Sequence, residues 1–260
     1  MYDSTVRDRA LGLLSSGLNI SEVSRRTGIS RFALREWRLR TEQGRDLYVA
    51  GARDCPRCTG SPSGPQPERD YAYLLGQYLG DGCISPVSDP GKGIWALRIS
   101  CANAWPGVMH ECEAAIRAIH PHNKVRLIPR EGCTEVNSHS KHWPCLFPQH
   151  SPGKKHLRKV ELAMWQQTIV ARHPERFVRG LLHSDGSRFT NRVRRQLPSG
   201  ERWYEYPRYN FTNLSLDIQV LFAEALDALE IPWKQMNRTT ISVARREGVA
   251  RLDEFVGPKY

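Results

Sequence analysis

The sequence predicts an α+β protein in which a small helical domain precedes two copies of one helix-and-strand repeat. An apolar helix that ends in Asp-Gly occurs twice, as LLGQYLGDG and VRGLLHSDG, and places Asp81 and Asp185 104 residues apart. A similar order of strands and helices follows each copy. Three short helical patterns and a segment rich in Pro, Gly and Ser come first. We therefore divide the chain into a helical domain (1–45), a linker (46–69), a first half (70–175) and a second half (176–260).

Composition points to a polyanionic partner. The chain has 260 residues, 40% of them hydrophobic, which is enough for one sizeable core or two moderate ones. Its formal net charge is +11, which favours nucleic acid. Neither a signal peptide nor a membrane span is readable, so we expect a cytoplasmic protein that is associated with the nucleoid through DNA. The seven cysteines are expected to be reduced thiols.

The first 45 residues are typical of a helix-turn-helix module. We expect helices at 4–17, 21–28 and 31–44, with Ser21 as the N-cap of the second and the turn GIS before the third. In this interpretation the third helix enters the major groove of DNA, and Ser30, Arg31 and Arg35 near its start contact phosphates or base edges. The alternative is a small helical bundle that carries its arginines on the solvent side.

The linker contains a Cys-x-x-Cys pair, Cys55 and Cys58. Two thiolates at this spacing can form half of a zinc site, but zinc needs four ligands and no second pair follows. Further ligands could come from a downstream cluster, which comprises His139, His142, Cys145 and His150. The alternative is a loop with two reduced cysteines.

The remaining elements alternate along both halves. In the first half we expect strands at 94–101 and 124–130 and helices at 105–119 and 156–173; in the second, a hairpin at 187–211, helices at 215–231 and 249–256, and a strand at 239–246.

Strand alternation predicts which side chains reach DNA. Arg98 lies opposite the apolar face of its strand. In the hairpin, Phe189 and Val193 share the face that we expect to be buried. The opposite face is then basic and hydrogen-bonding and suits DNA, and its residues are Arg188, Thr190, Arg192, Arg194 and Gln196.

Small residues four apart predict close packing of the two apolar helices at a pseudo-twofold axis. These residues are Gly76 and Gly80 on one helix and Gly180 and Ser184 on the other. Such packing would bring Asp81 and Asp185 together, where two carboxylates repel unless a cation lies between them. Oxygen ligands suit Mg²⁺, and a metal-holding carboxylate pair beneath a basic sheet describes a phosphodiester hydrolase.

The two motifs resemble those of single-chain LAGLIDADG homing endonucleases, and the similar order of elements covers about residues 70–260. The resemblance implies two pseudo-symmetric αββαββα halves whose sheets form a saddle on DNA. It implies that Asp81 and Asp185 coordinate two or more Mg²⁺ ions and that the small residues form the helix interface. The family also supplies basic residues late in each half. Lys154 or Lys155 matches this place in the first half, whereas the second half has Arg245 and Arg246 and no lysine.

We therefore expect a monomer with internal pseudo-twofold symmetry that binds double-stranded DNA specifically and cleaves it with Mg²⁺. The alternative is a transcriptional regulator that joins a helix-turn-helix to a LAGLIDADG domain and no longer cuts. A third hypothesis is a remnant in which each Asp-Gly only ends a helix.

Overall fold

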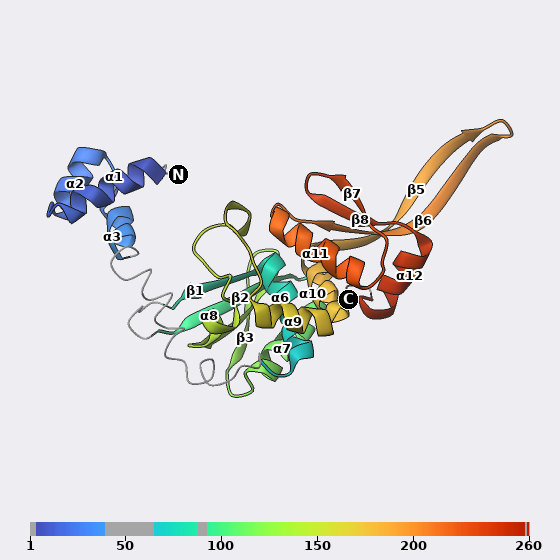
Figure 1. Ribbon diagram of the computed structural model, residues 1–260, viewed down its shortest axis with the longest axis horizontal. Helices are drawn as coiled ribbons and strands as arrows, with labels where there is room; N and C mark the ends of the chain where they lie inside the picture. Colours follow the sequence, from blue (N-terminus) through green and yellow to red (C-terminus); the bar gives the residue numbers. More distant parts are fainter. Residues whose placement is uncertain (1–3, 40–64, 88–92, 258, 260) are drawn as a thin grey trace. The chain divides into compact units, whose positions relative to one another are not determined.

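The computed structural model describes residues 4–39, 65–87, 93–257 and 259. The chain forms two compact units, Met1–Pro56 and Arg57–Tyr260 (Figure 1). Cys55 and Cys58 lie outside the described residues, so the structure does not bear on zinc binding by that pair. Among the described helices, none has the length and apolar character needed to span a membrane.

The N-terminal unit contains α1 (Ser4–Ser15), α2 (Ile20–Thr27) and α3 (Arg31–Leu39). Ala10, Val23, Ile29 and Leu34 form its core. Gly28, with φ of 70°, ends α2 in the left-handed conformation and starts the turn into α3.

The N-cap of α2 is Asn19 and not Ser21 as predicted. The Asn19 Oδ1 atom accepts a hydrogen bond of 2.9 Å from the backbone N–H of Glu22. The helix starts at Ile20, so Ser21 is already inside its first turn, where its side chain cannot cap the free N–H groups in this way.

The first half consists of α6 (Glu68–Asp81), β1 (Gly82–Pro86), β2 (Trp95–Ala102), α7 (Pro106–Ile119), β3 (Val125–Pro129), β4 (Cys133–Ser140), the short α8 (Trp143–Leu146) and α9 (Met164–Arg172). Its antiparallel sheet has the order β1-β2-β4-β3. The predicted helix at 156–173 begins only at Met164. Before it, Val160 and Leu162 are buried while Lys159 and Glu161 are exposed, an alternation with a period of two that belongs to extended chain.

The second half repeats this order with α10 (Pro174–Asp185), β5 (Gly186–Leu197), β6 (Gly200–Thr212), α11 (Leu216–Ala228), β7 (Lys234–Asn237), β8 (Thr240–Val243) and α12 (Arg246–Phe255). Its sheet order, β5-β6-β8-β7, matches that of the first half. The expected pair of αββαββα halves is therefore confirmed. Strands β1, β4 and β7 were not predicted; β7 is exposed along its whole length and lacks the apolar alternation of a half-buried strand.

The β5–β6 hairpin extends beyond its sheet (Figure 1). β5 pairs with β6 from Gly186 to Leu197, whereas β8 pairs with β6 only from Tyr209 to Thr212. Beyond Tyr209 the hairpin is therefore a two-stranded ribbon.

Candidate active site and nucleic-acid interface

Helices α6 and α10 approach each other through backbone contacts. A Cβ atom added to Gly76 would lie 2.6 Å from the Phe177 carbonyl oxygen and 2.7 Å from the Leu181 nitrogen. One turn later, a Cβ on Gly80 would lie 2.5 Å from the Ser184 Cβ and 3.0 Å from Asp185 Oδ2. The helices therefore stay close as far as their C-terminal ends.

Asp81 and Asp185 end these two helices and influence each other electrostatically. Crowding by protein atoms raises the pKa of Asp81 to about 6, and the negative charge of Asp185 adds to the shift. Burial also raises the pKa of Asp185, although Asn213 Nδ2 donates to its Oδ2 at 2.6 Å and opposes the rise. Asp81 itself is exposed to solvent, whereas Asp185 is half-buried. The pair is thus a site where negative charge is costly without a nearby cation.

Lys155 provides one such cation at the end of α6. Its Nζ atom donates to the carbonyl oxygens of Tyr78, Gly80 and Gly82 at 2.5, 2.6 and 2.8 Å. Burial lowers the pKa of Lys155 to about 8, while Asp185 and Asp81 oppose the shift. Lys154, the other candidate from the sequence, is exposed at the residue before.

Lys259 provides the corresponding cation at the end of α10, and the sequence did not predict it. Its Nζ donates at 3.2 Å to the carbonyl oxygen of Ser184, the residue that matches Gly80 in the repeat. Burial lowers its pKa, and both aspartates oppose the shift. Arg245 and Arg246, which stand at the matching place in the sequence of the second half, are exposed at the start of α12, and the cations acting on Asp185 are Lys155 and Lys259.

Contacts from α10 hold the segment that carries Lys259. Arg179 NH1 donates to the carbonyl oxygens of Phe255, at 2.8 Å, and Val256. His183 Nε2 lies 3.1 Å from the same Val256 oxygen, and burial lowers the pKa of His183 to about 4. Neutral His183 with its proton on Nε2 can donate to this oxygen while Nδ1 accepts from Tyr73 OH at 3.1 Å. No local sequence pattern marks Lys259, because its position depends on these long-range contacts.

The structure reverses the predicted faces of the hairpin. Arg188 lies opposite Tyr209, and both face α12, where Asp253 accepts from Arg188 Nε at 2.7 Å and from Tyr209 OH at 2.7 Å. On the same side of β6, Phe211 packs against Phe222 of α11. The face with Arg188, Thr190, Arg192, Arg194 and Gln196 is therefore the one that the helices cover at its base. Phe189 and Val193 lie on the other face, and no helix of the described part of the chain buries them: Phe189 is 38% exposed.

Other predicted DNA contacts have partners within the protein. Arg98 lies on the polar face of β2 as expected, but its Nε is 3.4 Å from Glu135 Oε1 and its guanidinium also donates to Ser85. Ser30 Oγ accepts at 3.1 Å from the Ala33 nitrogen and so caps α3. Arg31 and Arg35 on α3 are exposed.

The oxygen atoms of the aspartate pair fit a hard divalent cation such as Mg²⁺, which takes one or two carboxylates and completes its shell with water and substrate oxygens. In the described residues, no group of three or more His, Cys, Asp or Glu side chains is arranged so that it could hold a metal ion. His139, His142, Cys145 and His150 therefore do not form a zinc site by themselves.

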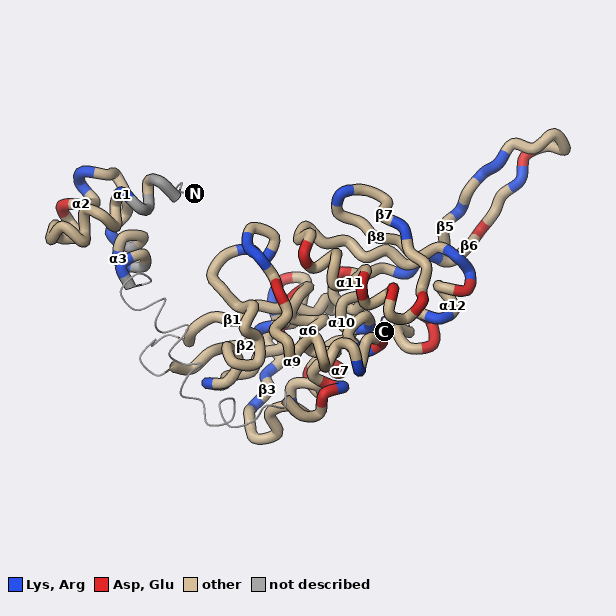
Figure 2. Tube along the Cα trace, in the orientation of Figure 1, with Lys and Arg blue, Asp and Glu red and all other residues tan. Residues whose placement is uncertain are grey.

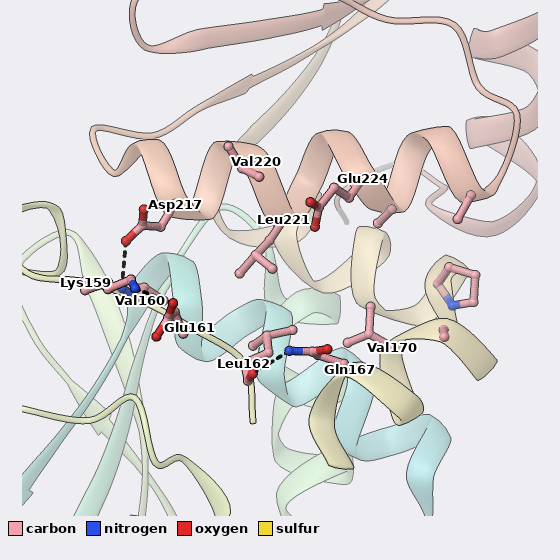
Figure 3. Close-up of a pocket in the computed structure, with 14 residues that line it drawn as sticks. Lys159, Val160, Glu161, Leu162, Gln167, Val170, Asp217, Val220, Leu221 and Glu224 are labelled. Carbon is pink, nitrogen blue, oxygen red and sulfur yellow. Dashed lines mark hydrogen bonds and ion pairs between the residues drawn. The ribbon is translucent and has the colours of Figure 1, made fainter. Parts of the chain in front are cut away.

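A groove of about 770 Å³ lies between α9 and α11, and neither Asp81 nor Asp185 lines it (Figure 3). Its floor is apolar, and its rim includes Glu161, Asp217 and Glu224. Asp217 Oδ2 accepts at 2.7 Å from the Val160 nitrogen, which ties the chain after Lys155 to the second half. This hydrogen bond helps to fix the path of the chain as it leaves the site after Lys155.

Two αββαββα halves with an aspartate at the end of each central helix have the architecture that the LAGLIDADG resemblance implies. No protein-family model matches the sequence, and no curated protein does. Solved structures do show similarity in fold. The crystal structure of I-DmoI in complex with DNA and Mn is 13% identical, with 74% of this chain and 98% of that chain covered and a TM-score of 0.49.

Two further structures are more distant. The LAGLIDADG meganuclease I-AabMI bound to uncleaved DNA is 12% identical over 71% of this chain and 82% of that chain, with a TM-score of 0.45. Full-length DUF199/WhiA from Thermatoga maritima is 14% identical over 77% of this chain and 58% of that chain, with a TM-score of 0.41.

Proposed function

We propose that this protein is a sequence-specific, Mg²⁺-dependent endonuclease of double-stranded DNA. The observation that carries the proposal is the aspartate pair: Asp81 and Asp185 end two helices that touch through their backbones, and each helix end holds a lysine ammonium. A protein that only bound DNA would gain nothing from two carboxylates crowded together in a basic chain.

The residues of the site have different roles. Asp81 and Asp185 would hold the cation, which when bound activates water and stabilises the leaving oxygen. Lys155 has its three N–H groups directed at three carbonyl oxygens, so it fixes the end of α6 and contributes positive charge. Within the described part of the chain Lys259 donates to one acceptor, the Ser184 oxygen, which leaves N–H groups for a phosphate. Lys259 is therefore our candidate for stabilising negative charge on the scissile phosphate.

DNA binding would use the basic charge of both units. We assign Arg31 and Arg35 of α3 to contacts with DNA, as the helix-turn-helix interpretation predicts, and the two sheets to the central part of the site. One chain with two similar halves can match the two strands of a duplex without a second subunit. A cytoplasmic location and a zinc ion at Cys55 and Cys58 stay predictions of the sequence; metal analysis of the purified protein decides the latter.

A selection experiment tests the proposal. The protein is used to select binding sites from a random double-stranded pool, and the selected duplex is then incubated with Mg²⁺. The parent should cut both strands, and Asp81→Asn and Asp185→Asn should bind but not cut. Lys259→Met should slow cleavage at least tenfold, with Lys159→Met, which removes an exposed lysine paired to Glu161, as the control.

The outcomes separate the two classes of function. Selection of a specific site with no cuts under Mg²⁺ or Mn²⁺ would refute the nuclease and leave a DNA-binding regulator built on the same fold. Cutting that survives both aspartate substitutions would show that the catalytic site lies elsewhere.

A further inference from the structure

Helix α11 leaves apolar side chains in contact with water. On its inner side, Ile218, Phe222 and Leu226 are fully buried. On another side, Val220 lines the groove between α9 and α11 and is 46% exposed, and Leu216, one turn before it, is 69% exposed. A helix surface that meets only water ordinarily carries polar residues, so this side of α11 has the composition of a surface that is covered.

Apolar side chains from both helices form the floor of the groove. Leu221 of α11 and Val170 of α9 point into it from opposite sides, and the buried Leu162 lies between them (Figure 3). The thirteen residues of α11 are about 20 Å long, which is the length of more than three helical turns. A trough between two helices with an apolar floor is the shape into which a third helix packs.

The rim of the groove is acidic although the chain carries a net charge of +11. Glu161, Asp217 and Glu224 line it, and among the described lining residues the cation is Lys159. Lys159 pairs with Glu161 at the surface, where such a pair contributes little, and Glu224 has no ion pair within the described part of the chain. Figure 2 shows acidic positions on α11, whose sequence contains no Lys or Arg.

These charges decide between classes of partner. Carboxylates repel the phosphates of nucleic acid and the headgroups of anionic lipid, so neither suits the groove. A helix with an apolar stripe and basic residues beside the stripe matches both the floor and the rim.

We propose that the groove between α9 and α11 is a docking site for a basic amphipathic α-helix of another protein. The apolar stripe of that helix would cover Leu221 and Val170, and its lysine or arginine side chains would reach Glu161 and Glu224. Neither aspartate of the pair lines the groove, so a docked partner would leave the site proposed for cleavage open. The inference therefore does not depend on the proposed nuclease activity.

Two stapled peptides test the docking site on the full-length protein. Each is a helix of about 16 residues with leucine at every third or fourth position, and one carries lysine beside this stripe where the other carries glutamate. Fluorescence anisotropy measures their affinity at low salt and without DNA. A photoreactive group in the leucine stripe then locates the bound lysine peptide, by mass spectrometry of the cross-linked protein.

We expect the lysine peptide to bind at least tenfold more tightly than the glutamate peptide and to cross-link to α9 and α11. Glu161→Gln/Glu224→Gln should weaken the lysine peptide about fivefold and reduce the difference between the two peptides. The control Glu131→Gln/Glu230→Gln removes the same charge from two exposed residues outside the groove and should change affinity less than twofold.

A second pair of variants tests the apolar part of the groove. Val220→Arg places a cation among the lining residues and should weaken the lysine peptide at least tenfold. Met236→Arg makes the same change of charge on β7, at a residue that is 49% exposed, and should have less than a twofold effect. Far-UV circular dichroism checks that every variant keeps the fold.

Several results would overturn the proposal. Equal affinity for the two peptides, cross-links outside α9 and α11, or equal losses in the groove variants and their controls would show general attraction to the surface. Self-association of the parent in sedimentation that Val220→Arg abolishes would identify the occupant as a second copy of the chain instead. Since DNA is absent from all these measurements, none of these results bears on whether the protein cuts DNA.

Discussion

Replacement of Gly76 by alanine tests whether backbone contact between α6 and α10 holds the site together. Alanine alone would stabilise a helix by about 0.5 to 1 kcal/mol relative to glycine. Here the new Cβ would lie 2.6 Å from a carbonyl oxygen, against an ordinary separation of about 3.5 Å, so α10 has to move by about 0.9 Å. The neighbour is backbone and cannot rotate away. Overpacking against such a neighbour costs up to about 3 kcal/mol and the helix gain offsets up to about 1 kcal/mol, so we expect Gly76→Ala to lower the free energy of unfolding by about 2 kcal/mol.

Urea unfolding followed by tryptophan fluorescence measures this change. Gly248→Ala is the matched control, because a Cβ on Gly248 of α12 meets only side-chain atoms, the nearest at 3.0 Å. It should shift stability by less than about 1 kcal/mol. The displacement in Gly76→Ala would also separate the two aspartates, so cleavage at saturating substrate should fall about a hundredfold. A Gly76→Ala protein as stable and active as the control would refute the close packing of the helices.

Three further outcomes are expected. Lys155→Met should cost about 2 kcal/mol of unfolding free energy in urea, because three carbonyl oxygens lose their donor, whereas Lys154→Met should cost less than about 0.5 kcal/mol. Asn19→Ala should reduce the thermal stability of the N-terminal helices by about 1 kcal/mol in circular dichroism, and an equal effect of Ser21→Ala would contradict the observed N-cap. Burial lowers the pKa of His150 from 6.5 to about 4, so its contribution, at most about 3 kcal/mol, is present above pH 6.5 and is lost as the pH falls towards 4. His150→Phe should therefore flatten the fall of the urea midpoint between pH 7 and pH 4.5, and an unchanged slope would contradict this assignment.

Local sequence patterns predicted the repeated architecture, but they did not predict which face of the hairpin the helices cover. Strand alternation in 187–197 separates two groups of residues, yet it does not say which group the helices cover. Phe189 and Val193 suggested the buried side, whereas the face that the helices cover is set by Tyr209 and Phe211, at the base of the neighbouring strand. The signal was present in β6, where these two aromatic residues alternate with Arg208 and Asn210, and pairing the two strands in register would have found it.

Features that depend on contacts between residues far apart in the sequence could not be predicted from local patterns. The helix expected at 156–173 loses its first part because Val160 is bound to Asp217, more than fifty residues away. Lys259 reaches the end of α10 only because Arg179 and His183 hold Phe255 and Val256. The two Asp-Gly motifs, by contrast, carry the small residues of the helix contact and the aspartates in one stretch, so the sequence alone could specify this part of the site.

The ribbon also has a consequence for how copies of the protein behave together. Beyond Tyr209, no strand of the described residues pairs with either of its outer edges, and free edges of this kind invite another chain to pair with them. Arg195 and Arg202 would meet the same charges on a second copy and repel it. These charges would therefore keep the free protein dispersed, and the Arg195→Ala/Arg202→Ala variant should self-associate at lower concentration than the parent in light scattering.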